Sequence, residues 1–234
     1  MSAEGSVLVA GVGPGLGIAV AARFARDGYR VAMLARDRDL LAAMAAEAPD
    51  HLVAIPCDVT DPAQVSAAFD ETERRLGPLV CVVSNAGAYR PGSILDIAPS
   101  DFEYCWRVGA FAGFLIGQAA ARRMVQRESG TILFTGATAS LRGGANFANL
   151  ASPKFALRAL AQCMARELGP RGIHVAHVII DGQIGGTAED DDASRLTDSR
   201  LAPDAIAEAY INLHRQHRSA WSQEIDLRPW VERF

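Results

Sequence analysis

The chain has 234 residues, of which 50% are hydrophobic and 21% are charged, and its formal net charge at pH 7 is -4. This composition excludes a disordered protein, and the length fits one large domain whose core needs neither disulfides nor metal ions. The slightly acidic balance, without a block of basic residues, gives no electrostatic basis for binding nucleic acid.

Short apolar runs alternate with helical patterns from the N-terminus onward. In the first half, strands are predicted at residues 6–10, 30–35, 52–57 and 79–83. Helices are predicted between them at residues 16–27, 39–47 and 62–76. Gly28 follows the first helix as a cap, and Pro62 opens the third, because proline fits the first turn of a helix.

The same alternation continues in the second half of the chain. Helices are predicted at residues 102–127, 148–168 and 203–217, and strands at residues 131–135, 174–180 and 224–227. Strands separated by helix-length connections run parallel, and continuously apolar strands are typical of burial on both faces. The sequence therefore predicts the α/β class, with a single doubly wound parallel-sheet Rossmann domain over residues 1–234.

Several features bear on where the protein works. The N-terminal residues include Glu4 and no basic segment, so no signal peptide is expected. The uncharged stretch 7–22 is too short and too rich in glycine for a membrane span. The cysteines are far apart and form no CxxC pair; they are Cys57, Cys81, Cys105 and Cys163. We therefore expect a cytoplasmic protein with no membrane partner and no metal site.

A glycine-rich turn joins the first predicted strand to the first helix, with the sequence Gly11-Val12-Gly13-Pro14-Gly15-Leu16-Gly17. Glycines at this junction allow a tight turn and a close backbone approach to a pyrophosphate, and the helix N-terminus supplies N–H groups and a positive dipole end. The alternative is a purely structural turn. The position in an alternating α/β chain favours a dinucleotide-binding turn.

The end of the second strand indicates which dinucleotide is bound. Folds that bind NAD usually place an acidic residue there, about 20 residues beyond the turn, to bind the ribose 2′-hydroxyl. In this chain Arg36 follows Ala35 at the end of the strand. A guanidinium in place of a carboxylate favours a 2′-phosphate, so we predict NADP(H) as the cofactor, against the alternative of a surface arginine.

With these features the chain resembles the short-chain dehydrogenase/reductase (SDR) family over nearly its whole length. The spacing Gly11-x-x-x-Gly15-x-Gly17 matches the family's cofactor turn, although Ala10 stands where threonine is usual. Asp58-Val59 resembles its adenine-contacting pair, and Asn85-Ala86-Gly87 its Asn-Ala-Gly element. Asp181-Gly182-Gln183-Ile184 resembles its Pro-Gly element near the nicotinamide, with Asp181 in place of proline.

The resemblance also implies which residues serve the reaction. We expect cofactor contacts from Gly11, Gly15, Leu16, Gly17, Arg36, Asp58, Val59, Asn85, Ala86, Gly87, Lys154 and Ile184. The family transfers a hydride between nicotinamide and a carbonyl or alcohol, with a tyrosine, a lysine, a serine and an asparagine at the site. Of these four, Lys154 is present as the expected catalytic residue.

The other three positions depart from the family. Leu150 stands four residues before Lys154 in place of tyrosine, Ala137 in place of serine, and Gly109 in place of asparagine. None of these three side chains can donate a proton. The spacing of enoyl reductases would put the tyrosine at Phe147, which does not restore it.

Other groups near the site remain open as proton donors. Thr138 follows Ala137 and presents a hydroxyl after a small shift in register, and Tyr89 lies in a loop near the expected cleft, where a packing role is the simpler interpretation. Lys154 holds the ribose hydroxyls or, when buried, acts as the donor. Pro153 predicts a local kink in this helix because it lacks a backbone N–H.

Two functions follow. The first is an NADP(H)-dependent short-chain-type oxidoreductase that acts on a small carbonyl or alcohol with an atypical proton donor. The second is a non-catalytic NADP(H)-binding protein, either a sensor or a partner subunit, which the three missing groups favour. The resemblance also implies a homodimer or homotetramer. It places a lid at residues 185–201, whose short polar sequence argues against a large apolar substrate.

Overall fold

The computed structural model describes residues 5–185 and 199–232, so most of the expected lid lies outside the described residues. The strands form one sheet in the order β3-β2-β1-β4-β5-β6-β7, and neighbouring strands run parallel. Their bounds are β1 Ser6–Ala10, β2 Arg30–Ala35, β3 Leu52–Pro56, β4 Leu79–Ser84, β5 Gly130–Thr135, β6 Ile173–Ile180 and β7 Glu224–Leu227. This arrangement confirms the predicted doubly wound parallel sheet.

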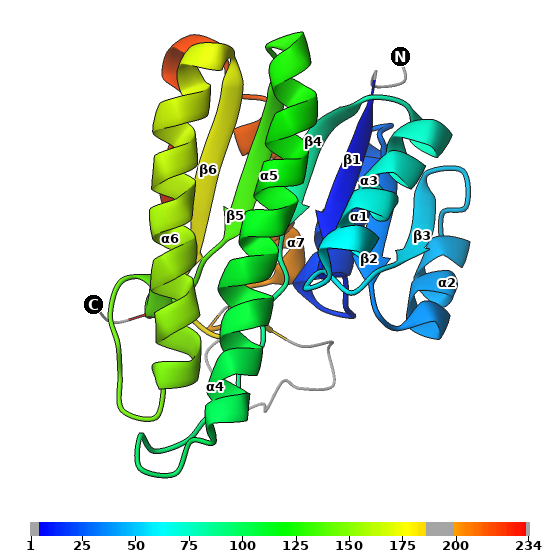
Figure 1. The fold of residues 1–234 in the computed structure, drawn as a ribbon. Coiled ribbons are helices and arrows are strands. Elements are labelled where there is room, and N and C mark those ends of the chain that lie inside the picture. Colours follow the sequence, from blue (N-terminus) through cyan, green and yellow to red (C-terminus); the bar gives the residue numbers. More distant parts are fainter. Residues whose placement is uncertain (1–4, 186–198, 233–234) are drawn as a thin grey trace.

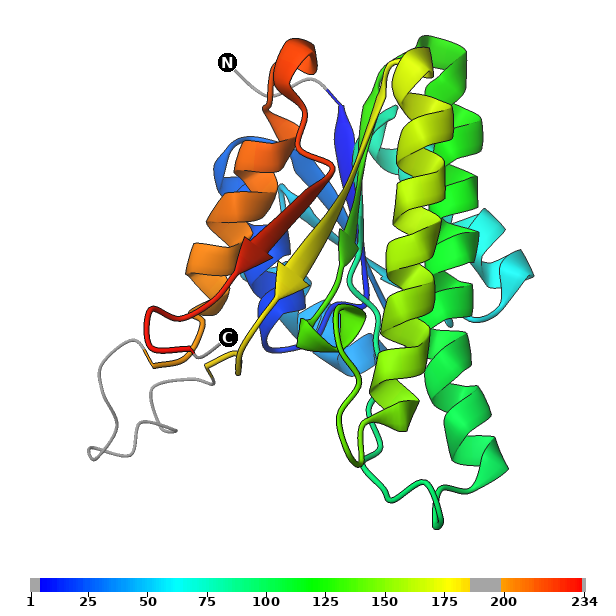
Figure 2. The same cartoon turned by 90° about the vertical axis from the view of Figure 1, so that its left-hand side faces the viewer.

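Helices cover both faces of the sheet (Figures 1 and 2). Their bounds are α1 Leu16–Arg26, α2 Arg38–Ala46, α3 Pro62–Leu76, α4 Pro99–Trp106, α5 Ala112–Met124, α6 Ala148–Leu168 and α7 Pro203–His214. One buried cluster packs α1, α2 and α7 against the sheet, through side chains such as Phe24 and Ile206. The other packs α3, α5 and α6 through Phe69, Ile116 and Leu157. The strands are therefore buried on both sides, as their apolar runs predict.

Local signals explain where many elements begin and end. The carboxylate of Asp61 accepts hydrogen bonds from the backbone N–H groups of Ala63 and Gln64, so it caps α3. Pro62 occupies the first turn of that helix, and Gly77, with φ of 86°, follows its last residue. Sequence spacing alone was sufficient to place these ends.

Two helices differ from their predicted bounds by more than one residue. The helix predicted at residues 102–127 begins at Pro99, and a π-helical turn at Arg107–Phe111 joins α4 to α5. The last predicted helix ends at His214 rather than at residue 217, because His217 instead caps the short 3₁₀ turn Arg218–Ala220. A π turn inserts one extra residue into a helical turn, and the apolar period does not reveal it.

Pro153 lies inside α6, and the helix runs on through it to Leu168. Three cysteines are buried as small apolar side chains, whereas Cys163 is exposed on α6. Among the residues that the structure describes, no helix is long and apolar enough to span a bilayer. Within the same ranges, no three side chains of histidine, cysteine, aspartate or glutamate gather as a metal site would require.

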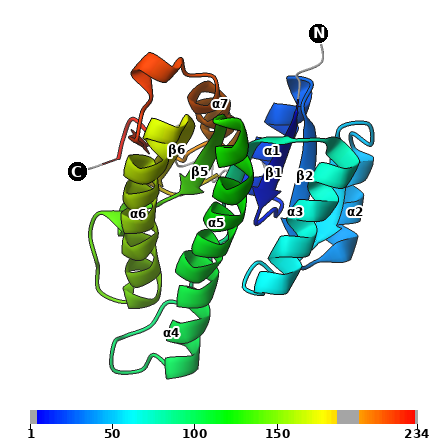
Figure 3. The ribbon, with the colours of Figure 1, turned by 45° about the horizontal axis from the view of Figure 1, so that its top comes forward.

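The order of the strands positions the functional site. The chain moves outward from β1 through β2 to β3 and then returns to β4 on the other side of β1. At such a reversal the connections that leave the neighbouring strands turn in opposite directions and open a crevice at their carboxyl ends. Figure 3 shows α3 and α5 on either side of this position. The loops after β1 and β4 therefore meet at the natural ligand crevice.

A partly buried histidine makes the fold sensitive to acid. The ring of His214 lies 3.0 Å from Thr131 Oγ1 through Nδ1 and 3.2 Å from the Tyr29 hydroxyl through Nε2. Burial lowers the pKa of His214 to about 4. Between about pH 6.5 and pH 4, His214 is protonated in the unfolded chain and neutral in the folded protein. The free energy of unfolding therefore falls as the pH falls through this range.

We expect the free energy of unfolding to drop by about 2–3 kcal/mol between pH 6.5 and pH 4 on account of His214. Urea denaturation at a series of pH values measures this loss. The variant His214→Gln should show a flatter pH dependence, and His217→Gln, at an exposed position, serves as the control. Equal pH dependence in His214→Gln and the wild type would contradict the assignment.

Candidate functional site

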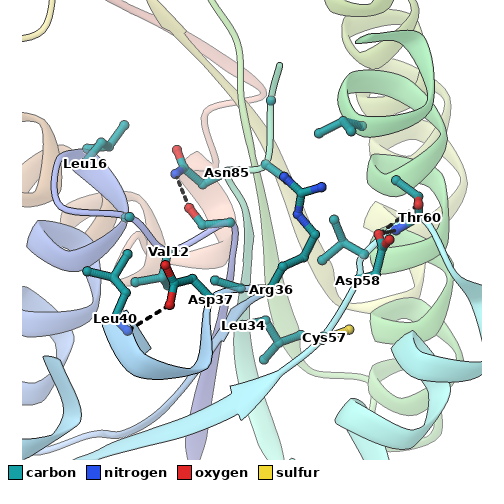
Figure 4. A pocket seen from close by; sticks show the side chains of 18 of the residues that line it. Val12, Leu16, Leu34, Arg36, Asp37, Leu40, Cys57, Asp58, Thr60 and Asn85 are labelled. Atoms are coloured by element: carbon teal, nitrogen blue, oxygen red, sulfur yellow. Dashed lines mark hydrogen bonds between the residues drawn. The ribbon is translucent and has the colours of Figure 1, made fainter. Parts of the chain in front are cut away.

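A cavity of about 470 Å³ opens at the carboxyl ends of β1, β2 and β4 (Figure 4). The structure brings together there all the expected nucleotide contacts except Lys154 and Ile184: Gly11, Gly15, Leu16, Gly17, Arg36, Asp58, Val59, Asn85, Ala86 and Gly87. Lys154 and Ile184 line an adjoining cavity of about 310 Å³. The two cavities share residues of the glycine turn and of the loop after β4, so they form one continuous site.

The glycine turn is tightly packed on one side and open on the other. Gly11 has a φ of 89°, and a Cβ there would lie 2.4 Å from the backbone N of Ala86. A Cβ on Gly17 would lie 2.7 Å from the Gly11 carbonyl oxygen. In contrast, a Cβ on Gly13 or Gly15 would meet no atom within 4 Å. The side chain of Asn85 donates a 2.8 Å hydrogen bond to the Gly11 carbonyl. The open side fits the close approach of a phosphate group.

The N-terminus of α1 faces this opening without a capping side chain. Gly15 occupies the cap position and makes no side-chain hydrogen bond, and the first turn of the helix contains no acidic residue. The first N–H groups of a helix need acceptors, and the helix dipole favours a negative charge at this end. The turn and the helix end together suit the diphosphate of a dinucleotide.

Two oppositely charged residues follow β2, and the structure separates their roles. The carboxylate of Asp37 accepts a 3.0 Å hydrogen bond from the backbone N–H of Leu40 and caps α2. Arg36 lines the cavity, and its guanidinium donates a 3.3 Å hydrogen bond to the neutral hydroxyl of Tyr104. Both side chains line the cavity, and the carboxylate of Asp37 is engaged there in capping α2. Sequence reasoning did not identify Tyr104, which comes from α4.

Lys154 lies at the inner end of the site. Its side chain is buried, with 6% of the residue exposed, and its ammonium donates a 2.6 Å hydrogen bond to the Thr135 carbonyl at the end of β5. Burial lowers the pKa of Lys154 to about 8, so the ammonium form still predominates at neutral pH. A Cβ on Gly87 would lie 3.8 Å from the ammonium nitrogen. Lys154 is thus held beside the loop after β4.

We call the cavity of about 310 Å³ that Lys154 lines the inner cavity. A second cleft, of about 1000 Å³, lies beside it. Leu150 and Ala137, the positions of the expected tyrosine and serine, both line it. Tyr89 also lines it, with its ring stacked on Phe147 at 5.3 Å between centroids. Arg142, Arg200 and Glu232 contribute charge to its walls. The cleft therefore presents an apolar surface where the family carries hydroxyl groups.

At Gly109, the third position that departs from the family, a neighbouring side chain fills the space that a larger residue would need. Gly109 lies in the π-helical turn, and a Cβ on it would lie 2.8 Å from the Cβ of Pro153 on α6. An asparagine has no room at this position while Pro153 is present. The glycine and the proline are thus a matched pair across two helices.

The structure also reveals contacts of Asp181 that the sequence pattern did not. Its carboxylate is buried at the end of β6, accepts a hydrogen bond from the Thr138 hydroxyl, and lies 3.3 Å from a guanidinium nitrogen of Arg228. Sequence reasoning singled out Thr138 and Asp181 separately and did not identify Arg228. These residues are far apart in the sequence, so no local spacing could have linked them.

Comparisons with known proteins agree on the architecture. The sequence model described as short chain dehydrogenase matches residues 6–190. The 3-oxoacyl-[acyl-carrier-protein] reductase MabA of Mycobacterium avium is 33% identical over 201 residues, which cover 86% of this chain and 73% of that protein. A short-chain dehydrogenase structure from Rhodopseudomonas palustris is 38% identical, with a TM-score of 0.84, over 97% of this chain and 99% of that one.

A more distant structure shares the fold. The alcohol dehydrogenase of the archaeon Thermococcus sibiricus, in a complex with 5-hydroxy-NADP, superposes with a TM-score of 0.87 over 98% of both chains. It is 24% identical to this chain, so the likeness concerns the fold.

The Gly109–Pro153 contact predicts a coupled effect on stability. Gly109→Ala should lower the free energy of unfolding by about 1–3 kcal/mol, because the new methyl group meets the proline ring. In the Pro153→Gly background, which lacks the Cβ and Cγ atoms that the methyl group would meet, the cost of Gly109→Ala should be smaller by about 1 kcal/mol, the coupling in a double-mutant cycle. Chemical denaturation gives these values. Gly169→Ala is the control, because its Cβ would meet nothing within 4 Å. Additive effects would show that the two positions are independent.

Proposed function

Because this chain belongs to the short-chain dehydrogenase family, we propose that it is an NADP(H)-dependent oxidoreductase that interconverts a carbonyl and an alcohol on a small molecule. The observation that carries the proposal is the open glycine turn at the uncapped end of α1, with Arg36 lining the same cavity. These features suit a dinucleotide that carries an additional phosphate. We also propose that residues 1–234 act as one NAD(P)-binding domain.

The proposed cofactor contacts divide by the part of the nucleotide that they meet. The glycine turn and the first N–H groups of α1 hold the diphosphate, and Arg36 binds the 2′-phosphate. Asp58 and Val59 lie beside the adenine; the carboxylate of Asp58 accepts bonds from the backbone and hydroxyl of Thr60, which hold this loop in place. When bound, the nicotinamide supplies or receives a hydride. The NADP-type ligand named for the T. sibiricus structure supports this choice.

At the nicotinamide end, Lys154 binds the ribose hydroxyls through its ammonium, and Ile184 contacts the ring. Support for the first role comes from the position of the ammonium, which lies in the inner cavity, close to Gly87. Its bond to the Thr135 carbonyl leaves it further N–H groups to donate. Lys154 contributes as a catalytic residue through this contact with the cofactor.

The substrate occupies the cleft beside the inner cavity. Tyr89, Phe147 and Leu150 form its apolar wall, which suits a small carbonyl or alcohol compound with an apolar portion. Since Leu150 and Ala137 offer no proton, the donor is an atypical group: water, Lys154 or a hydroxyl nearby.

A second candidate is a non-catalytic NADP(H)-binding protein, a sensor or a partner subunit. The observation that favours it is the coordinated loss of three groups: Leu150 and Ala137 line the cleft without hydroxyls, and Pro153 fills the space beside Gly109. Cofactor binding does not depend on these positions, so it would persist without turnover.

We further propose a homodimer or homotetramer, through the face formed by α4, α5 and α6. Four aromatic side chains are partly exposed on these helices: Phe102, Trp106, Phe114 and Phe155. Stacking contacts continue from Trp106 through Phe111 to Phe114. An exposed apolar surface of this kind is typical of an interface between subunits.

Cofactor preference tests the role of Arg36. NADPH should bind more tightly than NADH, and Arg36→Ala should weaken NADPH about 10- to 100-fold by removing a charge-assisted phosphate contact, with little effect on NADH. Titration by cofactor fluorescence measures both. Arg38→Ala, an exposed neighbour that does not line the cavity, is the matched control. Equal binding of NADPH and NADH by the wild type would exclude the proposed phosphate contact.

Restoring the family's hydroxyls distinguishes the two candidates. Leu150→Tyr lies one helical turn before Lys154, and with Ala137→Ser it supplies a proton donor in the cleft. If the protein is an oxidoreductase, the wild type should turn over members of a carbonyl and alcohol panel, and the double variant should be about 100-fold faster. Turnover that is absent in the wild type and present in the double variant would favour the non-catalytic candidate.

A further inference from the structure

The wall between the inner cavity and the substrate cleft contains a hydroxyl joined to a buried carboxylate. Ala137, Ile180 and Gly182 line both spaces, so they mark where substrate and nicotinamide would meet. Thr138 follows Ala137 at the end of β5 and lines the cleft. Asp181 lies between Ile180 and Gly182 at the end of β6. The two residues therefore border the junction from neighbouring strands.

Both carboxylate oxygens of Asp181 and its backbone N–H have partners. Oδ1 accepts the hydrogen bond from the Thr138 hydroxyl, and Oδ2 lies 3.3 Å from Nη2 of Arg228. Its backbone N–H donates a 2.8 Å bond to the Leu227 carbonyl on β7. Only 4% of the residue is exposed. A carboxylate this deeply buried needs such partners, and the threonine hydroxyl links it to the cleft.

Three other polar groups near the junction, those of Thr135, Ser140 and Lys154, are committed elsewhere. The Thr135 hydroxyl is hydrogen-bonded to the hydroxyl of Tyr210 at 2.7 Å, in the core. The Ser140 hydroxyl accepts the backbone N–H of Ala137 at 3.1 Å and is fully buried. The ammonium of Lys154 borders the inner cavity, and Lys154 does not line the substrate cleft. In contrast, Thr138 is bonded to a group that can take up its proton.

We propose that Thr138 and Asp181 form the proton-transfer pair of this protein, in which the threonine hydroxyl contacts the substrate oxygen and the carboxylate exchanges the proton. The inference rests on the oxidoreductase function proposed above and assigns its atypical donor. Arg228 is a positioning residue that holds the carboxylate toward Thr138.

The transfer balances in both directions. When an alcohol is oxidised, the substrate carbon loses a hydride to the oxidised nicotinamide cofactor, and the substrate hydroxyl gives its proton to Thr138 Oγ1. Thr138 passes its own proton to Asp181 Oδ1, so the threonine remains neutral and the carboxylate becomes a carboxylic acid. When a carbonyl is reduced, the reduced cofactor is the hydride source, and the protonated Asp181 returns the proton through Thr138 to the substrate oxygen.

The test compares variants that keep or remove this route. Thr138→Val should lower kcat at least about 100-fold, the scale of general acid–base catalysis, whereas Thr138→Ser should stay within about fivefold of the wild type. Asp181→Asn should lose a similar factor, and the double variant Thr138→Val/Asp181→Asn should be no slower than the single variants, because the two groups act in series. NADPH affinity, measured by fluorescence, should change less than about twofold in Thr138→Val, since the cofactor contacts lie elsewhere.

The other outcomes contradict either the proposed oxidoreductase function or the proton-transfer pair. If the wild type binds NADPH and turns over no member of the carbonyl and alcohol panel, the proposed oxidoreductase function fails, and this inference with it. If the wild type is active and Thr138→Val retains its rate, the function stands and the proton-transfer pair is wrong. A loss in Thr138→Ser equal to that in Thr138→Val, or parallel losses of NADPH affinity and melting temperature, would show a structural role only.

Discussion

The contact between the glycine turn after β1 and the loop after β4 is the constraint on which the whole site depends. Gly11 takes a backbone conformation that other residues rarely adopt, and its Cα lies against the backbone of Ala86. The Asn85 side chain then joins the two loops by donating to the Gly11 carbonyl. This contact sets the floor of the cavity, directs the N-terminus of α1 toward it and places Gly87 beside Lys154. The shape of the cavity and the position of Lys154 beside it thus both depend on this one contact.

Residues that depart from the family pattern are accompanied by neighbouring residues that fit them. The glycine at position 109 is accompanied by Pro153, which fills the space of the missing side chain. The aspartate that replaces the proline of the Pro-Gly element is accompanied by Thr138 and Arg228, which satisfy its carboxylate. A buried charge without partners would be strongly destabilising, so this site requires all three residues together. The residues that match the family's glycine turn and Asn-Ala-Gly element line one cavity, while Leu150 and Ala137 line the neighbouring cleft without hydroxyl groups.

Much of the fold was predictable because its signals are local. Apolar runs placed each strand to within about a residue, since a strand buried on both faces shows its length directly in the sequence. Helix ends such as those of α3 were readable from a capping aspartate, a first-turn proline and a glycine. The π-helical turn was missed because the apolar period does not reveal one extra residue in a turn, and the early end of α7 was missed because His217 caps the next turn instead of continuing the helix. The glycine turn and Arg36 were identified from their positions after the first two strands, and Lys154 from the resemblance to the family; the structure gathers them at one crevice.

By itself the sequence determined the alternating architecture and the glycine turn after the first strand, because both are matters of spacing along the chain. The absence of the tyrosine, serine and asparagine followed from comparing the chain with the family that it resembles. Only the tertiary structure showed that Arg36 and Asp37 both line the cavity, with the carboxylate of Asp37 capping α2 and the guanidinium of Arg36 bonded to the Tyr104 hydroxyl. It alone joined Thr138, Asp181 and Arg228, which come from three separate parts of the chain. Contacts between parallel strands and a distant C-terminal segment leave no period in the sequence, so their chemistry becomes visible only when the sheet is assembled.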